Sequence, residues 1–191
     1  MAAIRNGVAI DSSFGMSPQS GLPHNNRTGD LDPFAVLFVM RKLGLSIDEM
    51  AARLATKSGL AGISGTSGDV RDVAEAAAAG NPRGRLALDV FVRSIRRYLG
   101  VFLVELGGLD VLTFSGGIGE NSTEIRAAVC ANLAGFGIEM DESRNRTVRG
   151  EGPISPEGAR VTILVIPADE ERIVARATSK VVQSRSCTVE A

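Results

Sequence analysis

The amino-acid sequence predicts an α/β domain with a mixed sheet. Three observations lead to this class: a hairpin pattern near the N-terminus, a series of amphipathic helical segments, and two later strand–helix units. Strands alternating with helices in this way are typical of a sheet covered by helices. The 191 residues suit one domain or slightly more, and 44% hydrophobic residues are enough for a sizeable core.

The N-terminal third is predicted from its turn and cap residues. Residues 2–13 are expected to form a hairpin, because Asn6-Gly7 is a favoured two-residue turn. A loop at 13–30 follows, and structureless loops of that length are often functional. One helix is expected from Pro33 to Gly44, after the cap Asp32, and another at 47–56, where Ser46 and Glu49 form a capping box. The first of these helices carries an apolar stripe that contains Phe34, Leu37, Phe38 and Met40.

The middle of the chain is predicted to be a loop followed by two helices. Residues 57–69, KSGLAGISGTSGD, have the composition of a Gly/Ser loop. A helix at 70–79 stops at Gly80, and Asn81-Pro82 begins the longest helix, which runs to about residue 106. Its helically spaced apolar residues include Leu86, Val90, Ile95 and Leu99.

The C-terminal part is predicted to contain the two strand–helix units. The first is a strand at 109–114 and a helix to about residue 133, which Asn121 and Glu124 open as a capping-box pattern. Ile138 is expected to begin a short edge strand, and 144–158 to be a polar loop. The second unit is a strand at 161–166 and a helix from Asp169 to about residue 180, with the tail 184–191 frayed.

Composition excludes several classes of protein. The formal net charge is −1 and the 21 basic residues are scattered, so we expect neither a nucleic-acid partner nor a membrane partner. No stretch approaches the roughly 18 apolar residues of a membrane span, and the first residues lack the apolar core of a signal peptide. Cys130 and Cys187 stand singly, without metal-site spacing, which favours a cytoplasmic location.

The segment SGGIGEN, residues 115–121, is a candidate anion site. It joins a short strand to a helical pattern, and free N–H groups and the helix dipole favour negative charge at such a place. Taken alone, it is equally compatible with a tight strand–helix connection. It matches neither a dinucleotide fingerprint, whose third glycine would fall on Ser122, nor a phosphate loop with its Gly-Lys-Ser/Thr ending.

Three further segments place charged residues beside loops. Asp69 is expected to cap a helix, and Arg71 either pairs with a neighbouring acid or stacks on a planar ring. Arg27 is either a solvated loop residue or an arginine that binds a transferring phosphoryl group. Glu170 is either a helix N-terminal acid or an oxygen ligand for Mg²⁺. For the only histidine, His24, we favour a role as neither ligand nor base.

Taken together and in this order, these segments resemble the C-terminal part of acetate kinase, from the first hairpin to about residue 178. The resemblance is carried by AIDSSFGMSP, NRTGDLDP, KSGLAGISGTSGDVRD, LALDVF, TFSGGIGENSTEIR, FGIEMD and IPADEERIVAR. Propionate and butyrate kinases share the layout, and the wider group is the actin-like superfamily of acetate and sugar kinases. The resemblance implies an actin-like, ribonuclease H-like α/β fold with a mixed sheet.

The resemblance also implies a reaction and roles for single residues. The reaction is ATP plus acetate to ADP plus acetyl phosphate, with Mg²⁺ or Mn²⁺, in a cytoplasmic homodimer formed through this part of the chain. Arg27 matches the arginine that stabilises the transition state, and Glu170 matches the glutamate of the metal site. Asp69, Val70 and Arg71 match the segment beside the adenine. The turn that holds the nucleotide corresponds to Gly117, Ile118, Gly119, Glu120 and Asn121. In place of the Met-Gly-Thr common before the arginine stand His24, Asn25 and Asn26.

By the same resemblance, three parts of the family's enzymes have no counterpart here: the N-terminal domain, its Gly-Asn-Gly phosphate loop and the first strand of the C-terminal domain. Residues 1–168 are then an incomplete nucleotide-binding domain, and 169–191 a helix and tail that would pack on the absent domain. Ile173, Val174 and Val181 would lack that partner surface. Met1 is either an internal methionine of a longer gene or the start of a truncated one, and we hypothesise that the upstream DNA encodes the missing loop.

The chain alone is therefore expected to be marginally stable and inactive. The alternative to an enzyme part is a non-catalytic module that binds nucleotide or dimerises. A propionate or butyrate kinase is a lesser alternative, since the residues that select the acyl chain lie largely in the absent part. A sugar-kinase or chaperone-like ATPase fragment is disfavoured, because those relatives lack NRTGDLDP and GISGTSGDVRD.

Overall fold

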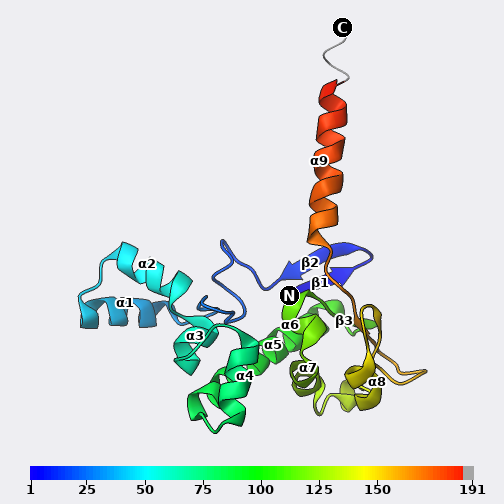
Figure 1. The fold of residues 1–191 in the computed structure, drawn as a ribbon, viewed down its shortest axis with the longest axis horizontal. Helices are drawn as coiled ribbons and strands as arrows, with labels where there is room; N and C mark the ends of the chain where they lie inside the picture. Colours follow the sequence, from blue (N-terminus) through cyan, green and yellow to red (C-terminus); the bar gives the residue numbers. More distant parts are fainter. Residues whose placement is uncertain (187–191) are drawn as a thin grey trace. The chain divides into compact units, whose positions relative to one another are not determined.

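The fold was analysed in a computed structural model, which describes residues 1–186 and confirms an α/β architecture with a mixed sheet (Figure 1). The chain divides into two compact units, Met1–Asp110 and Val111–Ala191. Each unit is described by itself. The boundary that the sequence suggested after residue 168 concerns packing on another domain and stays a prediction.

The first unit begins with the predicted hairpin. Strands β1 (Ala2–Arg5) and β2 (Val8–Ser12) pair antiparallel, with an irregular register between Ala3 and Ile4. Asn6 and Gly7 have φ angles of 51° and 78°, the positive values that a type I′ turn requires at both central positions. The hairpin is extended by a bond of 2.9 Å from the Ser13 N–H to the Met1 carbonyl.

Helices α1 (Pro33–Leu43) and α2 (Ile47–Thr56) begin at their predicted caps. Asp32 Oδ1 accepts from the Phe34 N–H, and Ser46 and Glu49 form both bonds of the capping box. The predicted apolar stripe of α1 is not part of a core, however, since none of the residues of α1 is buried. The exposed fractions of Phe34, Leu37 and Phe38 are 76%, 57% and 64%.

The segment predicted to be a Gly/Ser loop contains a short helix, α3 (Gly59–Ser64), so the loop prediction is wrong there. Helices α4 (Val70–Ala78) and α5 (Pro82–Leu106) agree with the predicted ones. Leu86 is 52% exposed, contrary to its predicted place on the apolar face. Helix α5 packs against α3, α4 and β1, and the buried apolar residues of these helices include Leu60, Val73, Ala87, Phe91, Leu99 and Phe102.

The second unit is built on a three-stranded mixed sheet in the order β3-β5-β4. Strand β3 (Val111–Phe114) runs parallel to β5 (Thr162–Val165), and β4 (Gly152–Pro153) runs antiparallel to β5. The buried residues include Ile125, Val129, Ile138, Ile154, Val161, Ile163 and Val165.

Three predictions in the second unit are wrong in detail. The glycines lie in a helix, α6 (Gly116–Asn121), and α7 (Thr123–Cys130) is capped by Ser122 rather than by Asn121. Ile138 begins no strand; it is 1% exposed and follows a 3₁₀ turn, η1 (Ala134–Phe136). The predicted polar loop contains the end of α8 (Glu142–Thr147) and strand β4.

The last helix, α9 (Glu170–Ser186), is longer than predicted. Asp169 Oδ1 accepts from the Arg172 N–H at 3.2 Å, which is the bond of an N-cap. Ile173, Val174 and Val181 are 62%, 63% and 53% exposed, and their packing against another domain stays a prediction. The predicted frayed tail lies outside the described residues from 187 onward. None of the helices in the described part is both long and apolar enough to cross a membrane.

Candidate functional site

Arg27 closes a tight backbone turn. The Arg27 N–H donates to the His24 carbonyl at 2.7 Å and the His24 N–H donates to the Arg27 carbonyl at 3.2 Å, with Asn25 at a φ of 44° between them. The backbone of Arg27 is therefore fixed. Its side chain is exposed and makes no hydrogen bond or ion pair within residues 1–186, so the guanidinium remains available to a ligand.

The turn that carries Arg27 lies on the N-terminus of α3. The Ser58 N–H donates to the Asn26 carbonyl and the Ala61 N–H donates to the Asn25 carbonyl, both at 2.9 Å. These carbonyls take the place of a side-chain cap, which α3 lacks. A Cβ on Gly59 would lie 2.5 Å from the Arg27 carbonyl oxygen, so this approach requires glycine.

The same turn also contacts the loop that leads to Asp69. A Cβ on Gly68 would lie 2.6 Å from Asn26 Oδ1 and 3.0 Å from the Asn25 carbonyl carbon. The structure therefore brings together two segments that the sequence singled out separately, the turn of Arg27 and the loop before α4. The approach of Gly68 to Asn25 and Asn26 was not predictable from residue spacing, since more than 40 residues separate Asn26 from Gly68 along the chain.

Asp30 fixes the other end of the Arg27 loop. Its Oδ1 accepts from the Gly21 N–H at 2.8 Å, and its Oδ2 accepts from the Tyr98 hydroxyl on α5 at 2.6 Å. Desolvation, followed by the bond to Asp30, raises the pKa of Tyr98 to about 12. This anchor was missed in the sequence, although Tyr98 is the only tyrosine in the chain.

His24 contacts the aromatic ring of Phe91, with ring centroids 6.4 Å apart. Partial desolvation of the imidazole, followed by the charge of Arg27, lowers the pKa of His24. The lowered pKa favours the uncharged form of the imidazole beside Arg27. The expectation that His24 is neither ligand nor base stays a prediction.

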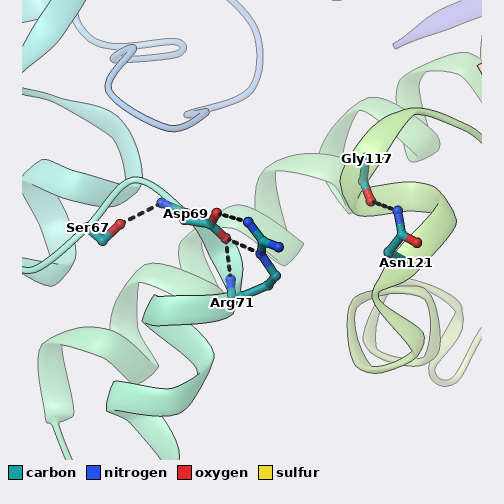
Figure 2. A network of polar contacts seen from close by, with 5 residues as sticks. All are labelled: Ser67, Asp69, Arg71, Gly117 and Asn121. Carbon is teal, nitrogen blue, oxygen red and sulfur yellow. Dashed lines mark hydrogen bonds and ion pairs between the residues drawn. The ribbon is translucent and has the colours of Figure 1, made fainter.

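Asp69 and Arg71 form an ion pair at the start of α4 (Figure 2). Asp69 Oδ1 accepts from the Arg71 N–H and Nε at 2.8 and 3.0 Å, and Oδ2 accepts from the Arg71 guanidinium at 2.6 Å. The hydrogen bonds from Arg71 lower the pKa of Asp69 to about 2. The Arg71 side chain is 88% exposed, so one edge of the guanidinium is fixed while its planar face stays open to stacking.

In the second unit, the predicted glycine turn is a short helix in which none of the residues is buried. Gly116 has a φ of 75°, and added Cβ atoms on Gly116 or Gly117 would meet nothing within 4 Å. Gly119 differs, because its Cβ would lie 3.3 Å from the Phe114 carbonyl carbon. Gly116 and Gly117 therefore leave room for a ligand beside the backbone, whereas Gly119 allows α6 to lie close to β3.

Glu120 and Asn121 hold the short helix together. Glu120 Oε1 accepts from the N–H groups of Gly116 and Ala168, at 2.7 and 2.8 Å. Asn121 Nδ2 donates to the Gly117 carbonyl at 2.8 Å (Figure 2). The carboxylate of Glu120 thus joins α6 to the segment after β5, which brings the glycines near the start of α9 and Glu170.

Glu170, like Glu171 beside it, has no hydrogen-bond or ion-pair partner within the described residues. Its carboxylate is exposed, whereas the neighbouring Asp169 makes an ion pair of 3.2 Å with Arg172. No group of three or more potential His, Cys, Asp or Glu ligands occurs among residues 1–186. The donor set fits Mg²⁺ bound through one protein carboxylate with water and phosphate, and it does not fit a structural metal site.

The comparisons with known proteins agree with this arrangement of loops. The sequence profile of the acetokinase family matches residues 1–176. The chain belongs to the acetokinase family. It is 45% identical over 184 residues to the acetate kinase of Treponema denticola, and 44% identical over 182 residues to that of Desulforamulus reducens. These alignments cover 96% and 95% of this chain but 46% of each relative, so the chain spans about half of their length.

Solved structures of this family show the same fold. The crystal structure of Porphyromonas gingivalis acetate kinase superposes with a TM-score of 0.88 at 39% identity, over 95% of this chain and 46% of that one. A propionate kinase from Francisella tularensis superposes with a TM-score of 0.80 at 33% identity, over 89% of this chain and 43% of that one. Both acyl specificities therefore occur among the chain's structural neighbours.

The residues predicted for an acetokinase site fall into two groups. Arg27 and the Asp69–Arg71 pair belong to the first unit, while residues 117–121 and Glu170 belong to the second. That both groups bind the same nucleotide stays a prediction. The sequence interpretation missed Arg126, a buried residue of α7 that contacts the glycine helix. Its signal was its position at helical spacing with Val129 and Cys130, on the apolar face.

Proposed function

We propose that this chain provides the nucleotide-binding part of an acetate kinase-type phosphotransferase. The reaction is ATP plus acetate to ADP plus acetyl phosphate. The proposal is supported most directly by one contrast within the acetokinase fold. Within residues 1–186, Arg27 and Glu170 keep exposed charges without a hydrogen-bond or ion-pair partner, whereas Asp69, Glu120 and Asp169 are bound to neighbouring groups.

In this reaction an acetate oxygen attacks the γ-phosphorus of ATP. A bond forms between that oxygen and phosphorus, the bond from phosphorus to the β,γ-bridging oxygen breaks, and ADP leaves with the electron pair. Negative charge on the three equatorial oxygens must be balanced throughout the transfer. Little covalent chemistry falls to the protein, so positions and charges of side chains decide the rate.

Arg27 is proposed to balance that charge. Its backbone is held by the turn with His24 and by α3, so the side chain extends from a fixed point. A guanidinium offers several donors in one plane, which suits phosphoryl oxygens. Because no carboxylate within residues 1–186 neutralises Arg27, its full charge remains available.

Glu170 is proposed to hold the divalent cation, Mg²⁺ or Mn²⁺. When bound, such a cation neutralises phosphate charge and orients the phosphates. The bonds from the Gly116 and Ala168 N–H groups to Glu120 keep the glycine helix and the start of α9 together. Glu170 and the proposed nucleotide-binding residues 117–121 therefore keep their relative positions.

Asp69, Val70 and Arg71 are proposed to contact the nucleoside. The ion pair with Asp69 fixes the orientation of the Arg71 guanidinium, and its exposed face can stack on a purine. Val70 is only 7% exposed, so its contribution is to anchor the start of α4.

The reaction is tested by trapping acetyl phosphate as the hydroxamate. Because the chain spans about half of its relatives, it is assayed alone and after mixing with the N-terminal portion of the Treponema denticola enzyme. We expect no product from the chain alone and product from the mixture. Unchanged product formation with the Arg27→Ala variant would contradict the role of Arg27.

The second candidate is a module that binds nucleotide or self-associates without catalysis. The exposed apolar residues of α1 favour association, since Phe34, Leu37 and Phe38 are all more than half exposed. The occupant we propose is a second copy of the chain, which gives a homodimer. Sedimentation velocity distinguishes the candidates: a dimer that binds Mg-ATP but yields no product with the N-terminal portion supports the second.

A further inference from the structure

Arg126 is buried and forms no ion pair with a carboxylate among residues 1–186. Its exposed fraction is 1%, which makes it the largest of the fully buried side chains in the described part. Burial lowers the pKa of the Arg126 guanidinium, although an arginine remains charged in any folded protein. A buried cation is costly unless it is hydrogen-bonded, so its contacts explain why it is there.

The guanidinium donates to four oxygen atoms, all of them uncharged. Nη1 donates to the carbonyls of Gly119 and Glu120, at 2.9 and 2.7 Å. Nε donates to Asn145 Oδ1 at 2.7 Å and Nη2 donates to the Asn145 carbonyl at 2.9 Å. Asn145 itself is 3% exposed and donates through Nδ2 to the Thr123 carbonyl at 3.0 Å.

The two carbonyls bound by Nη1 belong to the last turn of α6. In a continuous helix they would accept from the N–H groups of residues 123 and 124. The helix is interrupted at Ser122, whose φ of −101° and ψ of 98° are extended, so both carbonyls lose those donors. Arg126 replaces them, and its positive charge is favourable at the C-terminal end of a helix.

Arg126 therefore fixes the angle between α6 and α7. Glu120 and Arg126 hold α6 in complementary ways: the Glu120 carboxylate binds the N–H groups of Gly116 and Ala168, and Arg126 binds the carbonyls of Gly119 and Glu120. Every backbone group of 117–121 that a nucleotide could use depends on where these bonds place the helix.

We infer that Arg126 is a positioning residue for the nucleotide, acting through residues 117–121; this rests on the proposed function. Lysine cannot replace it, because one ammonium group has three donors at a single point, whereas the guanidinium donates four bonds to two segments that lie apart. Asn145 completes the network by joining α8 to the same guanidinium.

The test compares Arg126→Lys and Arg126→Gln with wild type and with the control Arg144→Gln. The side chain of Arg144, on α8, donates one bond of 3.2 Å to the Ser155 carbonyl and forms an ion pair of 3.8 Å with Asp141, and neither interaction involves α6. Three quantities are measured on the full chain: the Kd for Mg-ADP by calorimetric titration, amide hydrogen exchange at 116–121, and Tm.

For Arg126→Lys we expect a Kd raised about tenfold or more, as for the loss of one hydrogen bond to a charged group. Exchange at 116–121 is expected to become faster than exchange in β3. For Arg144→Gln we expect both quantities to match wild type even if Tm falls. An Arg126→Lys variant with a lowered Tm but unchanged exchange at 116–121 would overturn the inference.

The readouts separate this inference from the function on which it rests. If wild type does not bind Mg-ADP, the proposed function fails, and unchanged exchange at 116–121 in Arg126→Lys would still refute the structural role of Arg126. If wild type binds and Arg126→Lys binds equally well, the positioning role is refuted while the proposed function stands. Should Arg126→Gln fail to fold, Arg126→Lys still decides the question.

Discussion

Replacing Gly59 with alanine tests whether α3 determines the position of Arg27. Gly59 has a φ of +59°, and the added Cβ would lie 2.5 Å from the Arg27 carbonyl oxygen and 2.7 Å from the Asn25 carbonyl oxygen. A side chain in the left-handed region costs about 1–2 kcal/mol. Overpacking against fixed backbone adds about 1–3 kcal/mol, so the expected loss of unfolding free energy is about 2–5 kcal/mol.

The matched control is Gly44→Ala. Gly44 ends α1 at a φ of +64°, and its added Cβ would meet nothing within 4 Å. Both substitutions carry the same left-handed strain and the same effect on the unfolded chain. The difference between them therefore isolates the contact with the Arg27 turn.

The assay is urea denaturation followed by circular dichroism, with acetyl phosphate formation measured on the chain mixed with the N-terminal portion described above. Gly59→Ala is expected to lose at least about 1 kcal/mol more than Gly44→Ala, which is the lower bound of the overpacking cost. Product formation should fall only in Gly59→Ala, because the clash displaces the backbone of Arg27. Equal losses of stability and activity in the two variants would refute the reasoning.

Four further predictions concern single side chains. Arg27→Ala should lower kcat for acetyl phosphate about 10³-fold or more and leave Tm unchanged, because the side chain has no partner within residues 1–186; a matching Tm loss would argue for a structural role. Asp69 should titrate with a pKa of about 2 by carbon-detected NMR. Any stability that its ion pair with Arg71 contributes is therefore present at neutral pH and lost as pH falls through about 2. Arg71→Gln should raise the pKa of Asp69, and an unchanged pKa would disprove the pairing. Glu170→Gln should raise the Mg²⁺ concentration needed for half-maximal activity while Glu171→Gln does not, and equal effects would exclude a specific role. Phe38→Glu should weaken self-association in sedimentation velocity, whereas an unaltered sedimentation coefficient would exclude α1 from the interface.

The sequence predicted the elements whose ends are determined by local chemistry. Asn6-Gly7, Asp32-Pro33, the Ser46–Glu49 box and Asn81-Pro82 each act within a few residues, and all four mark the boundaries observed. It failed for α3, whose first turn is satisfied by carbonyls of Asn25 and Asn26. A cap that comes from more than 30 residues away has no local signature.

The candidate site shows the same limit. Family motifs identified Arg27, Asp69 and Glu170, but they did not reveal which of these charges are already paired. The role of Glu120 as the acceptor for Ala168, and of Arg126 as the donor to α6, depends on how strands and helices meet. Asn121 was predicted to be a cap because it precedes Glu124 by three residues, yet its amide binds Gly117 and Ser122 takes the cap.

The central proposal, which rests on the family motifs, is that residues 69–71 and 117–121 bind the same adenine nucleotide. It is tested most directly by titrating the isotopically labelled chain with Mg-ADP and following backbone amide chemical shifts. The account predicts that residues 69–71, 117–121 and Glu170 shift with one common Kd, while the amides of α1 do not shift. Shifts confined to one of these segments, or different Kd values for the two, would contradict it.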